Sequence, residues 1–190
     1  EMKQSITRWV VLSKVLPTAM FAKMAGVSNV GGDKEAVLLF TSGSSGSPKG
    51  VPLSHRNVLA NVCQFGTRLD LPKNSNILGS LPLFHSFGCT VTLWFPVIEG
   101  LNLITNPSPL DSKRIAELIE QYKIILLLST PTFLRGYMRR IKAEQLVSLK
   151  LVVTGAEKLP KSLSDTFAKK FGIRPQEGYG LTETSPATNV

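Results

Sequence analysis

The sequence contains little cysteine and little histidine. Its 190 residues include two of each, and Cys63 and Cys89 lie far apart. This spacing excludes a disulfide scaffold and a zinc knuckle and leaves two ordinary thiols. Hydrophobic residues make up 43% of the chain and charged residues 18%, which excludes a disordered, low-complexity chain. We therefore expect one compact domain, or a fragment of a larger protein, with a sizeable core.

One stretch lacks charge altogether. Residues 74–98 contain no Asp, Glu, Lys or Arg, which is a feature of membrane spans. The stretch is, however, interrupted by Gly79, Pro82, Gly88 and Pro96 and carries several polar side chains. Such interruptions favour a buried strand, a loop and a core helix over a helix that faces lipid.

Acidic residues are scarcer than basic ones, 13 against 22, so the net charge is +9. Much of the excess lies in residues 135–174, which contain ten basic residues and only three acidic ones. The ten are Arg135, Arg139, Arg140, Lys142, Lys150, Lys158, Lys161, Lys169, Lys170 and Arg174. A basic face can bind nucleotide phosphates, anionic lipid or an acidic protein, or it can simply be solvated. No nucleic-acid-binding motif accompanies the charge, so we expect no nucleic acid partner.

Residues 1–35 differ from the rest and are interpreted as a basic lead-in or linker that precedes a main domain of residues 36–190. Residues 2–25 contain four basic residues, no acidic residue and Trp9. We expect Pro17 to break any helix there. A basic stretch with tryptophan can lie on an anionic membrane surface, but a linker or a docked helix fits the pattern as well.

The main domain alternates short apolar segments with amphipathic ones, which predicts an α/β fold with a mostly parallel sheet flanked by helices. Strands are predicted at residues 36–41, 77–80, 101–105, 124–129 and 151–154. Helices are predicted at residues 112–122, with Asp111 as N-cap, and at residues 160–171, ending at Gly172.

The most informative segment is Thr41-Ser-Gly-Ser-Ser-Gly-Ser-Pro-Lys-Gly50, which directly follows the first predicted strand. Its glycines expose backbone N–H groups, its hydroxyls add donors, and Lys49 can offset the charge of a polyphosphate. It is not a Walker loop, because Pro48 precedes the lysine and Gly50 follows it. It also contains no G-x-S-x-G nucleophile elbow. The loop therefore predicts a phosphate-binding site of another kind.

Three ordered motifs resemble the adenylate-forming superfamily, which includes acyl-CoA synthetases, luciferases and peptide-synthetase adenylation domains. They are the loop above, Leu81-Pro-Leu-Phe-His-Ser-Phe-Gly88, and Glu177-Gly-Tyr-Gly-Leu-Thr-Glu-Thr184. A narrower resemblance rests on residues 81–88, 106–110, 155–159 and 177–183. These segments are similar to the acyl-[acyl-carrier-protein] synthetase part of the bifunctional 2-acylglycerophosphoethanolamine acyltransferase.

The resemblance implies ATP-dependent, Mg²⁺-dependent activation of a carboxylic acid, with a fatty acid as the expected substrate. The acyl group would pass to coenzyme A or to the phosphopantetheine thiol of acyl-carrier protein, in phospholipid acylation. It also implies a cytoplasmic-side location with association of the parent protein with the inner membrane. The family carries a small C-terminal lid with a catalytic lysine, and none follows Val190. We therefore expect a truncated nucleotide-binding part of the large N-terminal domain, inactive by itself.

The same resemblance implies roles for individual residues. The β- and γ-phosphates would be held by Thr41, Ser42, Gly43, Ser44, Ser45, Gly46 and Lys49. Thr41 and Glu183 would bind magnesium, and Thr182 would bind the α-phosphate. Tyr179 would stack on adenine in a slot lined by Gly155, Ala156, Glu177 and Gly178. His85 would lie beside the carboxylate, and the expected catalytic residues are Lys49, His85, Thr182 and Glu183.

Two other interpretations stay open at this point. An aryl-acid or amino-acid activating domain would share these motifs, although the apolar residues 85–98 offer no acid to meet an amine. A non-catalytic lipid- or protein-binding module on the same fold is the second alternative, and intact Lys49, Thr182 and Glu183 argue against it. A lone histidine in an apolar run is often an interior side chain, so the role of His85 depends on its motif.

Overall fold

The computed structural model describes residues 2–27, 31–42 and 46–189, and the chain divides into two compact units, Glu1–Lys34 and Glu35–Val190. The first unit contains helices α1 (Met2–Val15) and α2 (Thr18–Met24). Pro17 lies between them at the N-cap of α2, which confirms the predicted break. The rings of Trp9 and Phe21 meet edge to face at 5.7 Å between centroids.

The second unit is built on a five-stranded sheet in the order β4-β3-β5-β6-β7, in which every pair of neighbours is parallel. Its strands are β3 (Asn76–Gly79), β4 (Asn102–Thr105), β5 (Leu126–Ser129), β6 (Leu151–Thr154) and β7 (Gln176–Glu177). All four residues of β5 are buried, as expected for a strand covered on both faces. The predicted α/β fold with a parallel sheet is confirmed.

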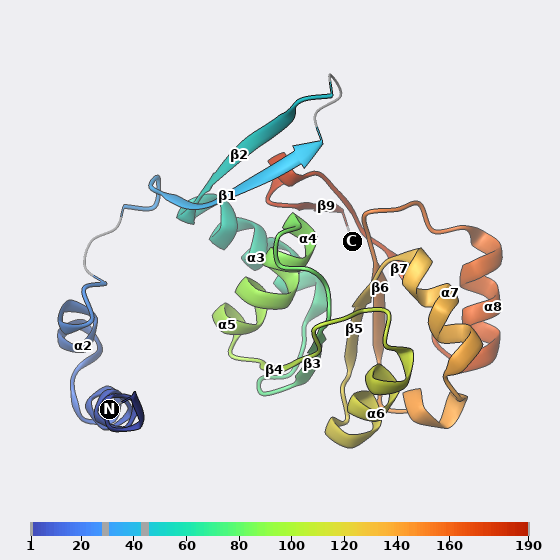
Figure 1. Cartoon of the computed structure of the whole chain (residues 1–190), viewed down its shortest axis with the longest axis horizontal. Coiled ribbons are helices and arrows are strands. Elements are labelled where there is room, and N and C mark those ends of the chain that lie inside the picture. The colour runs from blue at the N-terminus through green and yellow to red at the C-terminus, as the bar shows by residue number, and fades with distance from the viewer. Residues whose placement is uncertain (1, 28–30, 43–45, 190) are drawn as a thin grey trace. The chain divides into compact units, whose positions relative to one another are not determined.

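Helices cover both faces of this sheet (Figure 1). One face packs on α6 (Ser112–Tyr122), α7 (Pro131–Arg140), α8 (Lys161–Phe171) and the short 3₁₀ helix η2 (Ala143–Leu146). The other face packs on α3 (His55–Leu69) and on one continuous helical stretch. That stretch comprises α4 (Ser86–Cys89), the π-helical η1 (Thr90–Trp94) and α5 (Phe95–Glu99). Neighbouring residues of β5 enter opposite cores, with Leu127 in the first and Leu126 in the second.

The helix boundaries follow from capping. The Asp111 carboxylate accepts a hydrogen bond from Arg114 N at 3.0 Å, and α6 begins at Ser112, directly after this N-cap. Helix α8 ends at Gly172, which has φ of 75°. Pro160 occupies the N-cap position of α8, so the helix begins one residue later than predicted. The uncharged residues 74–98 form β3, a turn and the helical stretch that starts at Ser86. No helix in the described ranges has the length and apolar character needed to cross a membrane.

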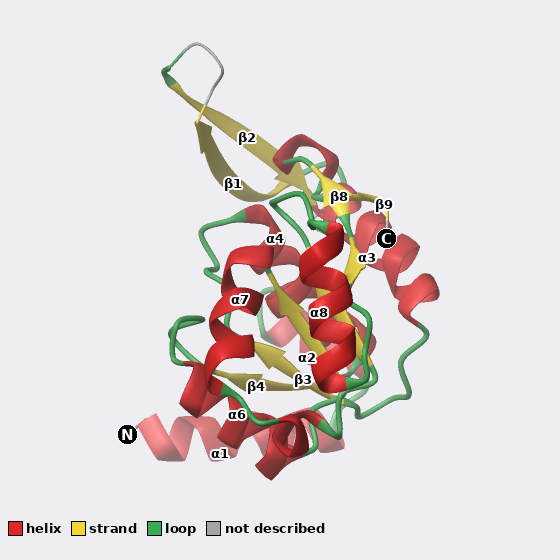
Figure 2. Cartoon of the chain, turned by 90° about the vertical axis from the view of Figure 1, so that its right-hand side faces the viewer, coloured by secondary structure: helices red, strands yellow, loops and turns green. Residues whose placement is uncertain are grey.

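The first predicted strand does not belong to the parallel sheet. Strand β1 (Glu35–Ser42) pairs with β2 (Pro48–Ser54) in a separate antiparallel hairpin, with Thr41 opposite Lys49. Figure 2 shows this hairpin extending away from the remainder of its unit. The connection explains the difference, because residues 43–47 can close a hairpin but are too few for a parallel crossover. At its base, Leu39 and Leu53 are buried in the second core.

The chain ends in a second, smaller hairpin. Strand β8 (Tyr179–Gly180) pairs antiparallel with β9 (Ala187–Asn189), and the 3₁₀ helix η3 (Thr182–Thr184) lies between them. The close approach of its strands needs a glycine, because a Cβ on Gly180 would lie 1.7 Å from the carbonyl oxygen of Pro186. This hairpin follows β7 directly and so starts at the edge of the parallel sheet.

Candidate active site

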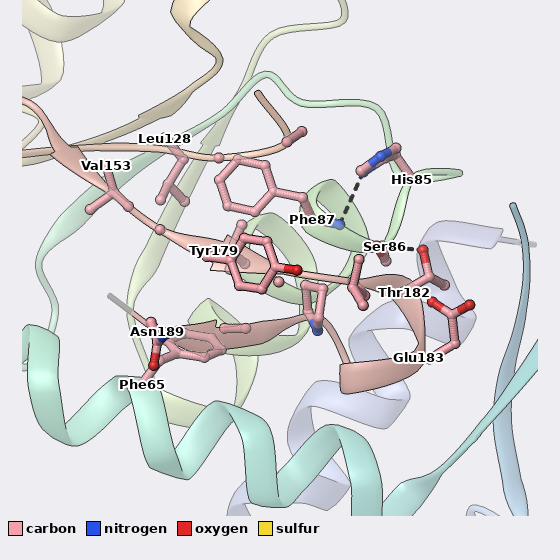
Figure 3. Close-up of a pocket in the computed structure, with 18 of the residues that line it drawn as sticks. Phe65, His85, Ser86, Phe87, Leu128, Val153, Tyr179, Thr182, Glu183 and Asn189 are labelled. Atoms are coloured by element: carbon pink, nitrogen blue, oxygen red, sulfur yellow. Dashed lines mark hydrogen bonds between the residues drawn. The ribbon is translucent and has the colours of Figure 1, made fainter. Parts of the chain in front are cut away.

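A cavity of about 340 Å³ lies where several sheet strands end (Figure 3). His85 comes after β3, Gly155 directly follows β6, and Gly178 directly follows β7. The carboxyl ends of parallel strands meet at one edge of a sheet, which is where open α/β sheets bind their ligands. Eight of the predicted site residues line this one cavity. They are Thr41, His85, Gly155, Ala156, Gly178, Tyr179, Thr182 and Glu183.

Other predicted site residues do not line the cavity. Glu177 is exposed, and its carboxylate accepts a hydrogen bond from Leu159 N at 3.0 Å, so it braces the loop after β6. Lys49 and Gly46 are exposed. Lys49 does not line the cavity, but it lies opposite Thr41 in the β1–β2 ladder, and Thr41 does line it. The backbone of Ser42 pairs with Pro48 at the end of β1. Gly43, Ser44 and Ser45 lie outside the described residues.

Part of the cavity wall lies at the ends of β6 and β7. Tyr179 on β8 is 59% exposed, so one face of its ring is open to a ligand. Gly155 leaves room for Phe87, since a Cβ there would lie 3.2 Å from the Phe87 ring. Ala156 has φ of 65°, a left-handed conformation that costs a non-glycine residue about 1 kcal/mol.

The polar end of the cavity carries oxygen atoms. The hydroxyl groups of Ser86 and Thr182 lie 3.1 Å apart, which joins the second and third motifs directly. Figure 3 shows Glu183 beside Thr182, and Thr41 lines the same cavity. No group of three or more His, Cys, Asp or Glu residues forms a metal cage in the described part of the chain. One carboxylate and a hydroxyl nevertheless fit Mg²⁺, which is bound by one or two carboxylates together with substrate phosphates.

His85 stands at the N-terminus of the helical stretch. It is exposed and caps α4, with its Nδ1 atom accepting a hydrogen bond from Phe87 N at 3.2 Å (Figure 3). An Nδ1 that accepts a hydrogen bond leaves the proton of the neutral ring on Nε2. The imidazole therefore offers an N–H donor to a ligand at the cavity mouth.

Sequence reasoning missed the apolar end of the cavity. Phe65 and Leu69 reach it from α3, while Leu128 and Val153 come from β5 and β6. Ser86 belongs to the motif of residues 81–88, but the sequence predicts no functional role for it. In the structure it is buried and its hydroxyl is hydrogen-bonded to that of Thr182. The apolar stripe of α3 is visible in the sequence, but its place against this cavity is a property of tertiary packing.

Comparison with known proteins identifies the family of this chain. The model of the AMP-binding enzyme family matches residues 7–190 of the chain. The chain belongs to the AMP-binding enzyme family. Among curated relatives it is 34% identical over 161 residues to a long-chain-fatty-acid–CoA ligase of Bacillus subtilis, covering 82% of this chain and 28% of the relative. It is 33% identical to a probable 4-coumarate–CoA ligase of Dictyostelium discoideum, covering 82% of this chain and 29% of that protein.

Solved structures agree on the fold. The ATP-bound form of MatB from Rhodopseudomonas palustris superposes with a TM-score of 0.76 at 26% identity, covering 84% of this chain and 32% of that one. The N-terminal domain of FACL13 from Mycobacterium tuberculosis gives 0.75 at 27% identity, covering 83% and 39%. The chain thus has the fold of the N-terminal domain of adenylate-forming enzymes and spans less than a third of the curated relatives above.

Proposed function

We propose that this family member activates a carboxylic acid with ATP and transfers the acyl group to a thiol. The observation that carries the proposal is a single cavity with two ends of opposite character. Figure 3 shows Thr182 and Glu183, with their oxygen atoms, at one end and Phe65 and Val153, with their apolar side chains, at the other. Thr41 lines the same cavity. A nucleotide phosphate and an apolar acid would therefore meet in one place.

The reaction has two steps. An oxygen of the carboxylate attacks the α-phosphorus of ATP, and the bond from that phosphorus to the pyrophosphate leaving group breaks. A thiol then attacks the acyl carbon, the bond to AMP breaks, and the thiol proton is released to solvent. Both steps require positioned reactants and neutralised charge more than covalent participation of the protein.

The described residues suggest how the protein meets these demands. In the proposed arrangement, Tyr179 stacks on adenine, Thr182 donates to the α-phosphate, and Lys49 offsets the charge of the outer phosphates. His85 donates from Nε2 to the carboxylate and holds it at the mouth of the cavity. Thr41 and Glu183 would hold Mg²⁺, which when bound neutralises phosphate charge.

The acid is proposed to be a fatty acid. Glu183 is the one acidic side chain among the lining residues of the described cavity, and it lies at the polar end. The remainder of the wall offers no charge to pair with an amine, which disfavours an amino acid. Similarity to a long-chain-fatty-acid–CoA ligase supports this choice. An aryl acid is the second candidate, because the 4-coumarate–CoA ligase relative is named for such a substrate.

The acceptor thiol is proposed to be coenzyme A or the phosphopantetheine of an acyl-carrier protein. Arg139, Arg140 and Lys142 are exposed at the end of α7 and could steer an acidic carrier. In the same basic segment, Lys170 donates to Met138 O at 2.6 Å and Arg174 pairs with Asp165 at 2.7 Å. Charge reversal of the three exposed residues should slow transfer to carrier protein while adenylate formation stays near normal.

We also propose that the protein acts at the cytoplasmic side of an anionic membrane, in phospholipid acylation together with an acyltransferase. The support is the first unit, where Ile6, Val10 and Val15 are exposed beside basic residues of α1. Vesicles of anionic lipid should bind this unit and release it as salt rises, whereas neutral vesicles should not bind it.

Pyrophosphate exchange tests the activation step. The polypeptide that carries this chain should exchange labelled pyrophosphate into ATP when fatty acids are supplied, with a maximum at one chain length. Coumarate and several amino acids serve as the comparison acids. Faster exchange with an aryl acid would replace the fatty acid by the second candidate. Exchange with none of these acids would contradict the proposed function.

A further inference from the structure

The buried face of α3 contains one polar residue in an apolar stripe. Asn61 is 5% exposed and lies among Val58, Val62 and Phe65, which are all buried. A buried amide without partners costs free energy, so a side chain of this kind is normally hydrogen-bonded. Asn61 therefore calls for a structural or functional explanation that the apolar stripe alone does not give.

Both ends of the Asn61 amide bind one distant residue. Nδ2 donates to the carbonyl oxygen of Ala187 at 2.7 Å, and Oδ1 accepts from Ala187 N at 3.1 Å. The two residues are 126 positions apart in the chain. This reciprocal pair satisfies both backbone groups of Ala187, as a neighbouring strand would do.

The residue held in this way is part of the cavity wall. Ala187 lines the cavity and begins β9, which pairs with β8 through Gly180 opposite Ala187 and Tyr179 opposite Asn189. Because a Cβ on Gly180 would meet Pro186 at 1.7 Å, the two strands lie too close to shift independently. A constraint on Ala187 is thus passed to Tyr179 and to the residues that follow it.

The other end of the connection leads to the phosphate loop. Helix α3 begins at His55, directly after β2, and Ser54 is its N-cap. The hairpin β1–β2 and the hairpin β8–β9 are therefore both attached to α3, the first through the chain and the second through Asn61. The positions of Thr41 and Tyr179 relative to one another depend on this attachment.

We propose that Asn61 is a positioning residue that locks the β8–β9 hairpin onto α3 and so preforms the cavity for a nucleotide. It touches no reacting atom and acts through Ala187. Preorganisation of this kind raises affinity because less ordering is required when the ligand binds. The expected effect on nucleotide affinity rests on the function proposed above, whereas the locking of the hairpin does not.

The same helix offers a matched control. Asn57 is exposed and lies one turn before Asn61, and its side-chain Oδ1 accepts hydrogen bonds from Ser54 N at 3.0 Å and from Ser54 Oγ at 2.8 Å. These bonds cap the start of α3 and do not reach the cavity. Asn57→Ala therefore reports the cost of losing a local cap. Asn61→Ala adds the loss of the connection to β9.

Amide hydrogen exchange tests the locking itself. In Asn61→Ala, residues 187–189 should exchange about tenfold faster than in the wild type, because local opening no longer breaks two hydrogen bonds. Asn57→Ala should leave this segment unchanged. Asn61→Asp keeps the acceptor for Ala187 N but places an oxygen against Ala187 O, so it should lose protection at least as strongly as Asn61→Ala.

Affinity for AMP, measured by calorimetry, tests the consequence. Asn61→Ala should weaken AMP binding about tenfold, while Asn57→Ala should keep the wild-type affinity even if both lower the melting temperature equally. Equal losses of affinity in the two variants would reduce Asn61 to a general stabiliser. Unchanged exchange at residues 187–189 in Asn61→Ala would overturn the inference. If wild-type protein binds no AMP, the proposed function fails, and hydrogen exchange still decides the role of Asn61.

Discussion

The two hairpins that contribute to the cavity are held in different ways. The β1–β2 hairpin has strands of eight and seven residues, and its own backbone ladder holds it together, with Phe40 66% exposed. The β8–β9 hairpin has strands of only two and three residues and is held by the sheet edge and by Asn61. The short hairpin presents Tyr179 and Thr182 to the cavity, whereas the long one carries Lys49 outside it.

This difference suggests a division of work. A cavity wall that is fixed by tertiary contacts can recognise a rigid group such as a base, because stacking requires an aromatic ring in a defined position and orientation. An extended arm that supplies charge can act through Coulomb attraction, which depends less on exact placement. We therefore expect changes in the short hairpin to affect structure and binding together, and changes in the exposed part of the long hairpin, beyond its buried Leu39 and Leu53, to affect binding alone.

The largest contrast should come from glycine replacements in the two hairpins. Gly180→Ala would place a Cβ 1.7 Å from Pro186 O, so we expect a loss of about 3 kcal/mol in the free energy of unfolding and loss of AMP binding. Gly50→Ala in the long hairpin meets the Leu38 side chain at 3.3 Å and the Phe40 ring at 3.5 Å, and both side chains are exposed and can move. It should cost less than about 1 kcal/mol. Chemical denaturation measures the free energy of unfolding of both variants. Equal losses of that free energy would contradict the contrast between the two hairpins.

The next effect concerns charge on the long hairpin. Lys49→Ala should lower the rate of pyrophosphate exchange by about 10- to 150-fold, since hydrogen bonds to charged groups are worth about 1.5–3 kcal/mol. Its unfolding midpoint should not change, because the side chain is exposed. Lys73→Ala, at another exposed lysine, should change neither quantity. An unchanged exchange rate in Lys49→Ala would disprove the assignment of the loop.

The smallest effect concerns helix α7, which packs on one face of the parallel sheet. Tyr137 is buried and its hydroxyl donates to Pro109 O at 2.8 Å, and burial raises the pKa of its phenol to about 12. The folded-state pKa lies above the unfolded value near 10. The stabilisation that the buried, neutral phenol gives to the folded state is therefore complete below pH 10 and is lost as pH rises toward 12. Tyr137→Phe should cost about 1 kcal/mol at pH 7. That difference in unfolding free energy should shrink above pH 10, and a constant difference would show that the phenol does not titrate in this way.

Much of the fold could be predicted from sequence where local signals agree. Helix α6 occupies the predicted residues 112–122 because its apolar stripe and the Asp111 cap specify the same start. Strand β5 is recognisable because the chain is apolar at every position from Ile124 to Leu128. The strand predicted at residues 36–41 was expected in the mostly parallel sheet, but it pairs with β2 in a separate hairpin that the sequence analysis does not predict. An apolar strand looks alike in either setting, and only the short connection distinguishes them.

The site was predictable only as far as its motifs extend. Tyr179, Thr182 and Glu183 share one short segment with a recognisable pattern, so their placement together follows from their closeness within residues 179–183. Glu177 belongs to the same pattern, but its carboxylate accepts a hydrogen bond from Leu159 N, a contact with the loop after β6 that the pattern does not specify. The role of Asn61 depends on a contact across 126 residues, which no local pattern specifies.

The central claim, that adenine binds in this cavity against Tyr179, is tested most directly by a pair of tyrosine replacements. Tyr179 and Tyr122 are 59% and 42% exposed, and only Tyr179 lines the cavity. Stacking of a base on an aromatic ring is worth about 1–3 kcal/mol. Calorimetric titration with AMP should therefore show at least about a fivefold loss of affinity in Tyr179→Ala and none in Tyr122→Ala. Wild-type affinity in Tyr179→Ala, or an equal loss in both variants, would contradict the account.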